Sequence, residues 1–185
     1  RPLTDTEIIN MVDHLYIGGN ETTTFALTSG LWLALSHPEA YQAMLADPSK
    51  VKNFVEENLR CESPTMGMVR HAAVDTEIAG VRIPKGASLH LRYAAGNRDE
   101  RMFECPAKFD IERRNAPRHM AFSLLETHCT GAGLSRLEQN IAFTAIFERL
   151  RNLRFMPGRN DFTHHPNVTL RAMKELWVEW DNPVR

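Results

Sequence analysis

The chain has 185 residues, a formal net charge of −1 at pH 7 and 43% hydrophobic residues. This length fits one domain with a sizeable core, and the near-neutral charge argues against a nucleic-acid-binding protein or a polybasic membrane partner. The three cysteines, Cys61, Cys105 and Cys129, are too far apart for a zinc finger and predict free thiols in a reducing compartment. The sequence contains no apolar run as long as a membrane span and no visible signal peptide, so we expect a cytoplasmic protein.

The first expected element is one long helix, which begins with the capping-box pattern Thr4-Asp5-Thr6-Glu7 and stops at Ser36-His37-Pro38. Its middle, residues 18–24, reads GGNETTT and is poor in helix-forming residues. Local rules that are broken inside an otherwise consistent helix often mark a functional site, and glycines let a flat ligand approach closely. The alternative is a kinked helix with solvated polar residues.

The remaining periodicity predicts shorter elements and a second long helix over residues 134–150. Shorter helices are expected over residues 37–46, 49–60 and 94–101. Strands are expected where the period is two, over residues 68–74, 77–83, 88–93, 168–170 and 176–180. Residues 103–117 are rich in charge and proline and predict a loop. The sequence therefore predicts a mainly α fold with a small mixed β region.

The stretch from His119 to Arg136 contains a candidate metal ligand. Phe122 precedes Cys129 by seven positions, Gly131 follows it, and an amphipathic run comes next. A cysteine just before a helix faces backbone N–H groups and the positive end of the helix dipole, and both favour the thiolate. Such a thiolate can ligate a soft or borderline metal, haem iron among them. The alternative is a small buried thiol.

Four individually weak signals occur in one order: Gly18-Gly19-x-Glu21-Thr22, Glu57-x-x-Arg60, Phe109-Asp110-x-x-Arg113, and Phe122 before Cys129-x-Gly131. In this order and spacing the chain resembles the C-terminal half of a cytochrome P450, a haem-thiolate monooxygenase, of the soluble bacterial type. The resemblance covers essentially all of residues 1–185. It implies the C-terminal portion of a P450-like fold, with the N-terminal half of the domain absent.

The resemblance also implies roles for individual residues. Cys129 would be the axial iron ligand of a haem b, and Glu21 and Thr22 match the acid–alcohol pair that guides protons to oxygen. Arg70 matches a basic residue that pairs with a haem propionate, and the alternative is an exposed strand arginine. The remaining expected haem contacts are Gly18, Gly19, Phe122, His128 and Gly131.

Two further sets of residues match the family pattern. Glu57, Arg60 and Arg113 match a buried ion network behind the haem, although Glu57 and Arg60 alone could be an exposed helical pair. Segments that usually line the substrate pocket match residues 66–68 and 169–170, where the methionines could equally be core filler.

The chain departs from the family pattern beside its cysteine. Ser123 and Leu125 stand where the family usually has glycine, and a positive φ at Leu125 would strain the backbone. Thr127 stands where the family usually has histidine or arginine, so a partner for a propionate is missing.

The resemblance implies an oxygenase that inserts one oxygen atom from O2 into a small apolar substrate, with electrons from a ferredoxin-type donor. Four basic residues are a candidate contact for that donor, or merely scattered surface charge: Arg113, Arg114, Arg118 and Arg136. The alternative function is that of a non-catalytic haem-binding or interaction fragment of a degenerate cytochrome P450. The intact residues 18–22 favour the enzyme, whereas the departures and the missing half favour the fragment.

Overall fold

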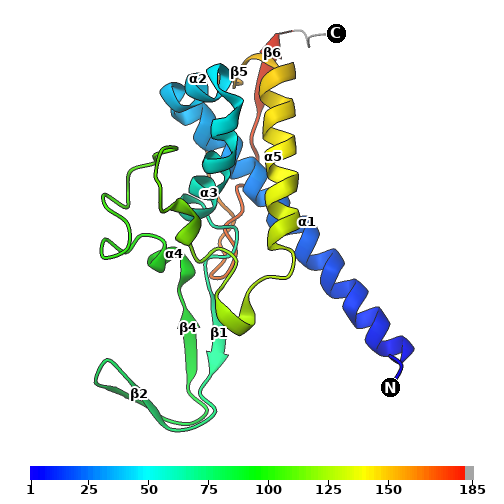
Figure 1. The fold of residues 1–185 in the computed structure, drawn as a ribbon, viewed down its shortest axis with the longest axis vertical. Coiled ribbons are helices and arrows are strands. Elements are labelled where there is room, and N and C mark those ends of the chain that lie inside the picture. Colours follow the sequence, from blue (N-terminus) through cyan, green and yellow to red (C-terminus); the bar gives the residue numbers. More distant parts are fainter. Residues whose placement is uncertain (182–185) are drawn as a thin grey trace.

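The computed structural model describes residues 1–181, and its body is built around two long helices that cross each other (Figure 1). The first is α1 (Asp5–Ser36) and the second is α5 (Ala132–Arg149). Between them in sequence come three shorter helices: α2 (Pro38–Ala46), α3 (Val51–Cys61) and α4 (Tyr93–Gly96). Single 3-10 turns lie at Pro48–Lys50, Ala116–Arg118 and Leu125–Thr127. The predicted helical fold is confirmed.

The strands form three separate two-stranded antiparallel pairs. These pairs are β1 (Met68–His71) with β4 (Ser88–Leu91), β2 (Thr76–Ile78) with β3 (Val81–Ile83), and β5 (Arg151–Phe155) with β6 (Val178–Asp181). The single strand predicted over residues 77–83 is wrong, because Ala79 and Gly80 turn the chain there with φ values of 50° and 80°. The strand predicted over 168–170 is also wrong: Leu170 forms only an isolated bridge to Thr65.

The start of α1 is set by its capping box, as predicted. The Thr4 side chain accepts a hydrogen bond from the Glu7 N–H at 3.3 Å, and the Glu7 carboxylate accepts one from the Thr4 N–H at 2.8 Å. The residue expected from the sequence to cap this third helix is Ser49, the first of residues 49–60, and this is wrong: Asp47 accepts from the Ser49 N–H at 3.1 Å and caps the 3-10 turn that precedes α3. The Ser49 hydroxyl itself donates to the Asp47 carboxylate at 2.6 Å, and Lys50, at the N-cap of α3, makes no side-chain cap.

The core lies where α1, α3 and α5 meet. The Phe54 ring packs edge-to-face on Phe143 at 5.0 Å between centroids, and both side chains are fully buried. Gly30 of α1 faces Phe143, and a Cβ at this position would overlap the ring. Glycine is therefore what lets α1 and α5 approach this closely.

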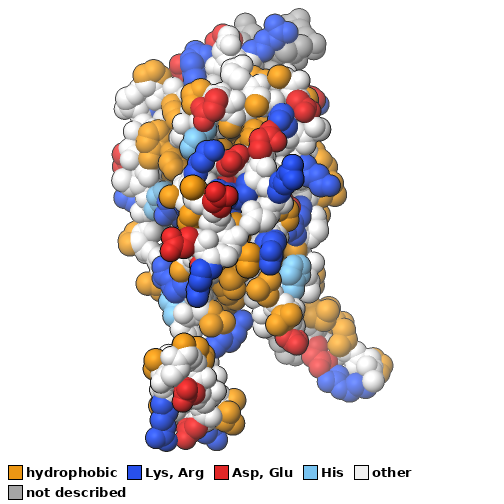
Figure 2. Space-filling view, turned by 60° about the vertical axis from the view of Figure 1, so that its left-hand side comes forward, with side chains coloured by type: hydrophobic (Ala, Val, Ile, Leu, Met, Phe, Trp, Pro, Cys, Tyr) orange, Lys and Arg blue, Asp and Glu red, His pale blue; other side chains and the backbone are white. Residues whose placement is uncertain are grey.

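The first half of α1 projects away from the body, and the β2–β3 hairpin projects from the same end (Figures 1 and 2). Large apolar side chains are exposed around this part of α1: Ile8, Ile9, Met11, Val12, Leu15, Tyr16 and Ile17. Exposed apolar surface of this extent usually contacts another molecule or segment. Within residues 1–181, no helix is long and apolar enough to cross a bilayer.

Candidate functional site

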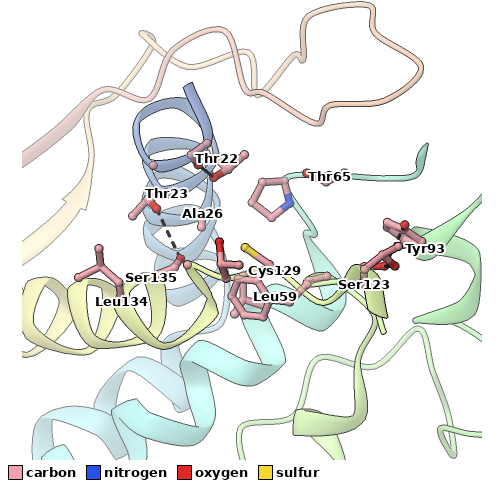
Figure 3. A pocket seen from close by; sticks show the side chains of 18 of the residues that line it. Thr22, Thr23, Ala26, Leu59, Thr65, Tyr93, Ser123, Cys129, Leu134 and Ser135 are labelled. Atoms are coloured by element: carbon pink, nitrogen blue, oxygen red, sulfur yellow. Dashed lines mark hydrogen bonds between the residues drawn. The ribbon is translucent and has the colours of Figure 1, made fainter. Parts of the chain in front are cut away.

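A cavity of about 330 Å³ opens beside the crossing of the two long helices (Figure 3). The helices touch at its edge, where the Thr23 and Ser135 hydroxyl oxygens lie 3.4 Å apart. From there the middle of α1 forms one wall, and the segment before α5 forms the facing wall. The lining is mainly apolar and includes Leu15, Ala26, Leu59, Met68, Phe122 and Leu134.

The GGNETTT stretch contributes three of its predicted residues to this cavity. Gly18, Gly19 and Thr22 line the wall, and a Cβ at either glycine would have no neighbour within 4 Å. The helix continues through the stretch without a break. Glu21 is exposed and does not line the cavity, so the structure separates the expected acid from the expected alcohol.

The Thr22 hydroxyl has a defined orientation. It donates to the Gly18 carbonyl at 2.7 Å, one turn back in α1. Because its single proton is used there, its oxygen can only accept a hydrogen bond from the cavity side. Thr24 makes the same kind of bond, to the Asn20 carbonyl at 2.8 Å, but it lies outside this cavity.

The facing wall holds most of the other predicted site residues. Cys129, Phe122 and Gly131 line it, and Arg70 reaches the same cavity from β1. Figure 3 shows the Cys129 sulfur within the pocket. His128 is exposed and outside the lining, and its ring centroid lies 6.5 Å from that of Phe122. The alternation of side chains along the loop thus turns His128 away from Cys129.

Of the three free cysteines, Cys129 is the one placed to act as a ligand. Burial, together with the nearby Glu57 carboxylate, raises the pKa of the Cys61 thiol to about 12. Cys61 is therefore a protonated, inert thiol at neutral pH. Cys105 is exposed and lies outside the cavity.

The ion network predicted from Glu57, Arg60 and Arg113 is confirmed. Glu57 accepts two bonds from Arg60, at 2.7 and 2.8 Å, and one from the Arg113 Nε at 3.1 Å. The three residues are only 0%, 1% and 9% exposed. The two guanidinium groups also donate to backbone carbonyls of the long loop: Asn97, Glu104, Cys105, Pro106 and Lys108. The network thus anchors to α3 the irregular segment that leads to the cysteine.

Replacing Glu57 by glutamine should therefore destabilise the fold. Two buried guanidinium groups would lose the one carboxylate that they contact among residues 1–181, and breaking a buried ion pair typically costs about 3–5 kcal/mol. The measurement is the free energy of unfolding in denaturant. Glu179→Gln is the control, because it removes a half-exposed carboxylate paired with Arg154 near the surface and should barely change stability. A Glu57→Gln protein as stable as the parent would contradict the network's role.

A second buried charge cluster was not predicted. Glu56, beside Glu57 on α3, accepts from Arg136 at 2.7 and 3.1 Å and contacts the His119 Nε2 at 3.1 Å. The His119 Nδ1 accepts the Ala121 N–H at 3.1 Å. The Arg136 guanidinium lies over the Phe122 ring, 4.5 Å from its centroid. This cluster therefore supports the backbone and the ring that precede Cys129.

The Glu56 cluster predicts a pH dependence. Burial alone would raise the pKa of Glu56, but hydrogen bonds from His119 and Arg136 outweigh burial and lower it to about 2. A carboxyl whose pKa is lower when folded stabilises the protein above about pH 4.5, and this stabilisation is lost as pH falls toward 2. The stability gap between the parent and Glu56→Gln should thus shrink over that range in urea titrations. A gap independent of pH would contradict this.

The departures from the glycine pattern have structural consequences. Ser123 and Leu125 adopt positive φ values of 58° and 53°, so the strain expected at Leu125 is present. Thr127 supplies no charge, but its hydroxyl lies 2.7 Å from that of Ser123. Sequence reasoning missed the next partner, Tyr93, whose hydroxyl lies 3.1 Å from Ser123. An aromatic residue at the end of a predicted strand gave no signal of this contact.

The cavity fits a flat, mostly apolar group with an anionic edge. The glycine wall is open and flat, the facing wall carries one thiol, and the charged Arg70 lies among the lining residues. Among the described residues, no three His, Cys, Asp or Glu side chains gather to hold a metal ion. Haem needs a single thiolate from the protein, and Cys129 is a thiol in this lining.

The family model described as Cytochrome P450 matches residues 1–172 of the chain. The chain belongs to the cytochrome P450 family. Putative cytochrome P450 140 of Mycobacterium tuberculosis is 39% identical over 152 residues, which cover 82% of this chain and 35% of the relative. The cytochrome P450 monooxygenase PikC of Streptomyces venezuelae is 34% identical over 179 residues, 96% of this chain and 43% of the relative.

Solved structures agree with this membership. The haem domain of Tepidiphilus thermophilus P450 superposes with a TM-score of 0.92 at 35% identity, and the match covers 97% of this chain and 42% of that one. A cytochrome P450 is in general a haem-containing oxidoreductase of the monooxygenase kind. The chain spans less than half the length of these relatives.

Proposed function

We propose that residues 1–185 form the C-terminal half of a single haem-thiolate domain. This domain would oxidise a small apolar substrate with O2. One observation carries the proposal: Cys129 and three residues of α1, Gly18, Gly19 and Thr22, line the same apolar cavity. The proposed cofactor is haem b, with its iron bonded to the Cys129 thiolate. When bound, haem supplies the oxygen chemistry, and a thiolate ligand favours cleavage of the O–O bond.

The chain's own residues would bind the cofactor, exclude water and handle protons. Gly18 and Gly19 leave room for a flat ring, and the apolar lining keeps water away from it. Arg70 offers a charged fork to an anionic edge, since its only described hydrogen bond goes to the Val69 carbonyl. The Thr22 oxygen would accept a hydrogen bond in the cavity and so hold a proton donor there.

Glu21 and His128 keep weaker proposed roles. Glu21 lies one position before Thr22 on α1 and is exposed, so it would relay protons from solvent to the cavity edge. His128 lies outside the cavity lining, so it would act on the cofactor indirectly, by supporting the loop that carries Cys129.

The proposed electron donor is a ferredoxin-type protein. Of the four basic residues considered for its docking, Arg113 is buried on Glu57 and Arg136 is paired with Glu56. Arg114 and Arg118 remain exposed. The contact surface for an acidic donor is therefore smaller than the sequence suggested.

The second candidate is a non-catalytic haem-binding or interaction fragment. It is favoured by the exposed apolar surface along the first half of α1, which no other described part of the chain covers. A chain that loses its haem cannot oxidise a substrate. The two candidates therefore differ first in whether the chain retains haem.

The test is a haem titration of the purified chain followed by a carbon-monoxide difference spectrum of the reduced protein. The monooxygenase predicts stoichiometric haem and the carbonyl band typical of a thiolate ligand. Haem bound without that band would support a non-catalytic haem-binding fragment. No haem binding at all would contradict the monooxygenase and support an interaction fragment.

A further inference from the structure

The loop of residues 122–129, here called the cysteine loop, is closed on itself. The Cys129 N–H donates to the Phe122 carbonyl at 2.8 Å. Between these ends, Ser123 and Leu125 adopt the left-handed conformation, with φ values of 58° and 53°. Residues other than glycine rarely adopt this backbone conformation, and it persists only where surrounding contacts maintain it.

The Leu125 side chain does not provide those contacts, because the residue is 84% exposed. Two backbone hydrogen bonds contribute: the Thr127 N–H donates to the Leu124 carbonyl at 3.2 Å, and the His128 N–H donates to the Leu125 carbonyl at 3.0 Å. Both lie within the loop. The Ser123 N–H also donates to the Met120 carbonyl at 2.9 Å, but this bond holds only the start of the loop, so none of the three ties residues 124–128 to the rest of the fold.

A chain of three hydroxyl groups makes that connection. The Thr127 hydroxyl donates to the Leu124 carbonyl at 3.0 Å, which uses its only proton. The Ser123 hydroxyl, 2.7 Å away, must then donate to the Thr127 oxygen, and the Tyr93 hydroxyl must donate to Ser123 at 3.1 Å. Figure 3 shows the Tyr93–Ser123 contact on the cavity wall. Since Tyr93 is buried, this end of the chain is fixed.

We propose that Ser123 and Thr127, tied to Tyr93, form a hydroxyl clamp that keeps the cysteine loop in its strained conformation and so positions Cys129 toward the cavity. The proposal rests on the proposed function, because positioning matters only if Cys129 binds a cofactor. Ser123 and Thr127 are thus positioning residues that act through the backbone of the loop.

The clamp acts on Cys129 because the loop is short and closed. The clamp contact joins Ser123 and Thr127, and Cys129 follows Thr127 by two residues. The Cys129 N–H is itself bonded back to the Phe122 carbonyl. The Tyr93, Ser123, Thr127 and Cys129 side chains all line the one cavity. If Ser123 or Leu125 relaxed to negative φ, the path between the two loop ends would change and the thiol would move. A loop held in advance also lowers the ordering cost of binding.

The first arm of the test needs no cofactor. Thr127→Val removes the hydroxyl and keeps the shape, whereas Thr127→Ser keeps the hydroxyl and is the matched control. In the protein without haem, amide hydrogen exchange at His128 and Cys129 should be about tenfold faster in Thr127→Val, the effect of losing one or two hydrogen bonds. Exchange in α3 should not change. Equal exchange in the parent, Val and Ser proteins would overturn the clamp.

The second arm measures haem affinity by titration. Thr127→Val should weaken binding by about tenfold, and Thr127→Ser should not. The loss should be smaller when Leu125→Gly is also present, because glycine removes the strain that the clamp opposes. Faster exchange with unchanged affinity would overturn the positioning role. If the parent binds no haem, the proposed function fails, while the exchange arm still decides whether the clamp exists.

Discussion

Cys129→Ser should abolish the carbonyl band of a thiolate-bound haem completely. In the proposed site Cys129 supplies the only protein bond to the iron, and no other thiol lines the cavity. A serine hydroxyl stays protonated at neutral pH and is a harder ligand, so it cannot replace the thiolate. The measurement is the difference spectrum of the reduced protein with carbon monoxide, at equal protein concentration.

Two controls make this result specific. Cys105→Ser changes an exposed thiol outside the cavity and should leave the band at full height. Cys129→Ser itself should unfold at nearly the same denaturant concentration as the parent, because the residue is exposed and its thiol makes no hydrogen bond among the described contacts. A Cys129→Ser protein that keeps the thiolate band would remove Cys129 as the ligand.

The long helices were predictable because their signals are local. A capping box sets the start of α1, and the apolar spacing carries it to Ser36. The small β pairs were harder, because each strand has only three to five residues and little burial. β5 was missed because Arg151 and Arg154 interrupt any apolar alternation. Its partner β6 comes more than 20 residues later, so the pairing depends on where the chain returns in space and not on the local sequence pattern.

The site shows the same division between local and distant information. The glycines of α1 and the spacing around Cys129 could be found in the sequence, because each lies within a few residues. That Glu21 lies outside the cavity while Thr22 lines it follows from the rotation of α1, which only packing fixes. The hydroxyl chain from Tyr93 to Thr127 depends on the contact between Tyr93 and Ser123, which lie 30 positions apart, so no spacing rule could have predicted it.

Two residues adjacent in sequence, Glu56 and Glu57, contact different partners in the structure. The Glu57 carboxylate accepts hydrogen bonds from Arg60 and Arg113. The Glu56 carboxylate contacts His119 and Arg136. Two adjacent carboxylates on one helix ordinarily indicate a solvated face, yet both are buried here. Each carboxylate has its own set of hydrogen-bond donors, and both sets connect α3 to the segment that leads to Cys129. The helix α3 is thus the support against which the cysteine loop is built.

Thr22→Ala should leave haem binding unchanged but lower the product formed per electron consumed. The Thr22 oxygen can only accept from the cavity, because its proton is held by the Gly18 carbonyl. Alanine removes this acceptor without touching Cys129 or the cavity's apolar wall. Loss of one positioned proton-transfer group typically costs about 10²–10⁴-fold in rate, so electrons should leave as hydrogen peroxide instead.

Thr24→Ala is the matched control for this prediction. Thr24 has the same hydrogen bond to the carbonyl four residues back in α1, yet it lies outside the cavity. It therefore reports what losing such a bond does to the helix alone, and its coupling should equal that of the parent. The measurement compares product, peroxide and electrons consumed in a preparation that turns over. If Thr22→Ala also keeps full coupling, the threonines serve only the helix, and proton handling must be assigned to another residue of the cavity.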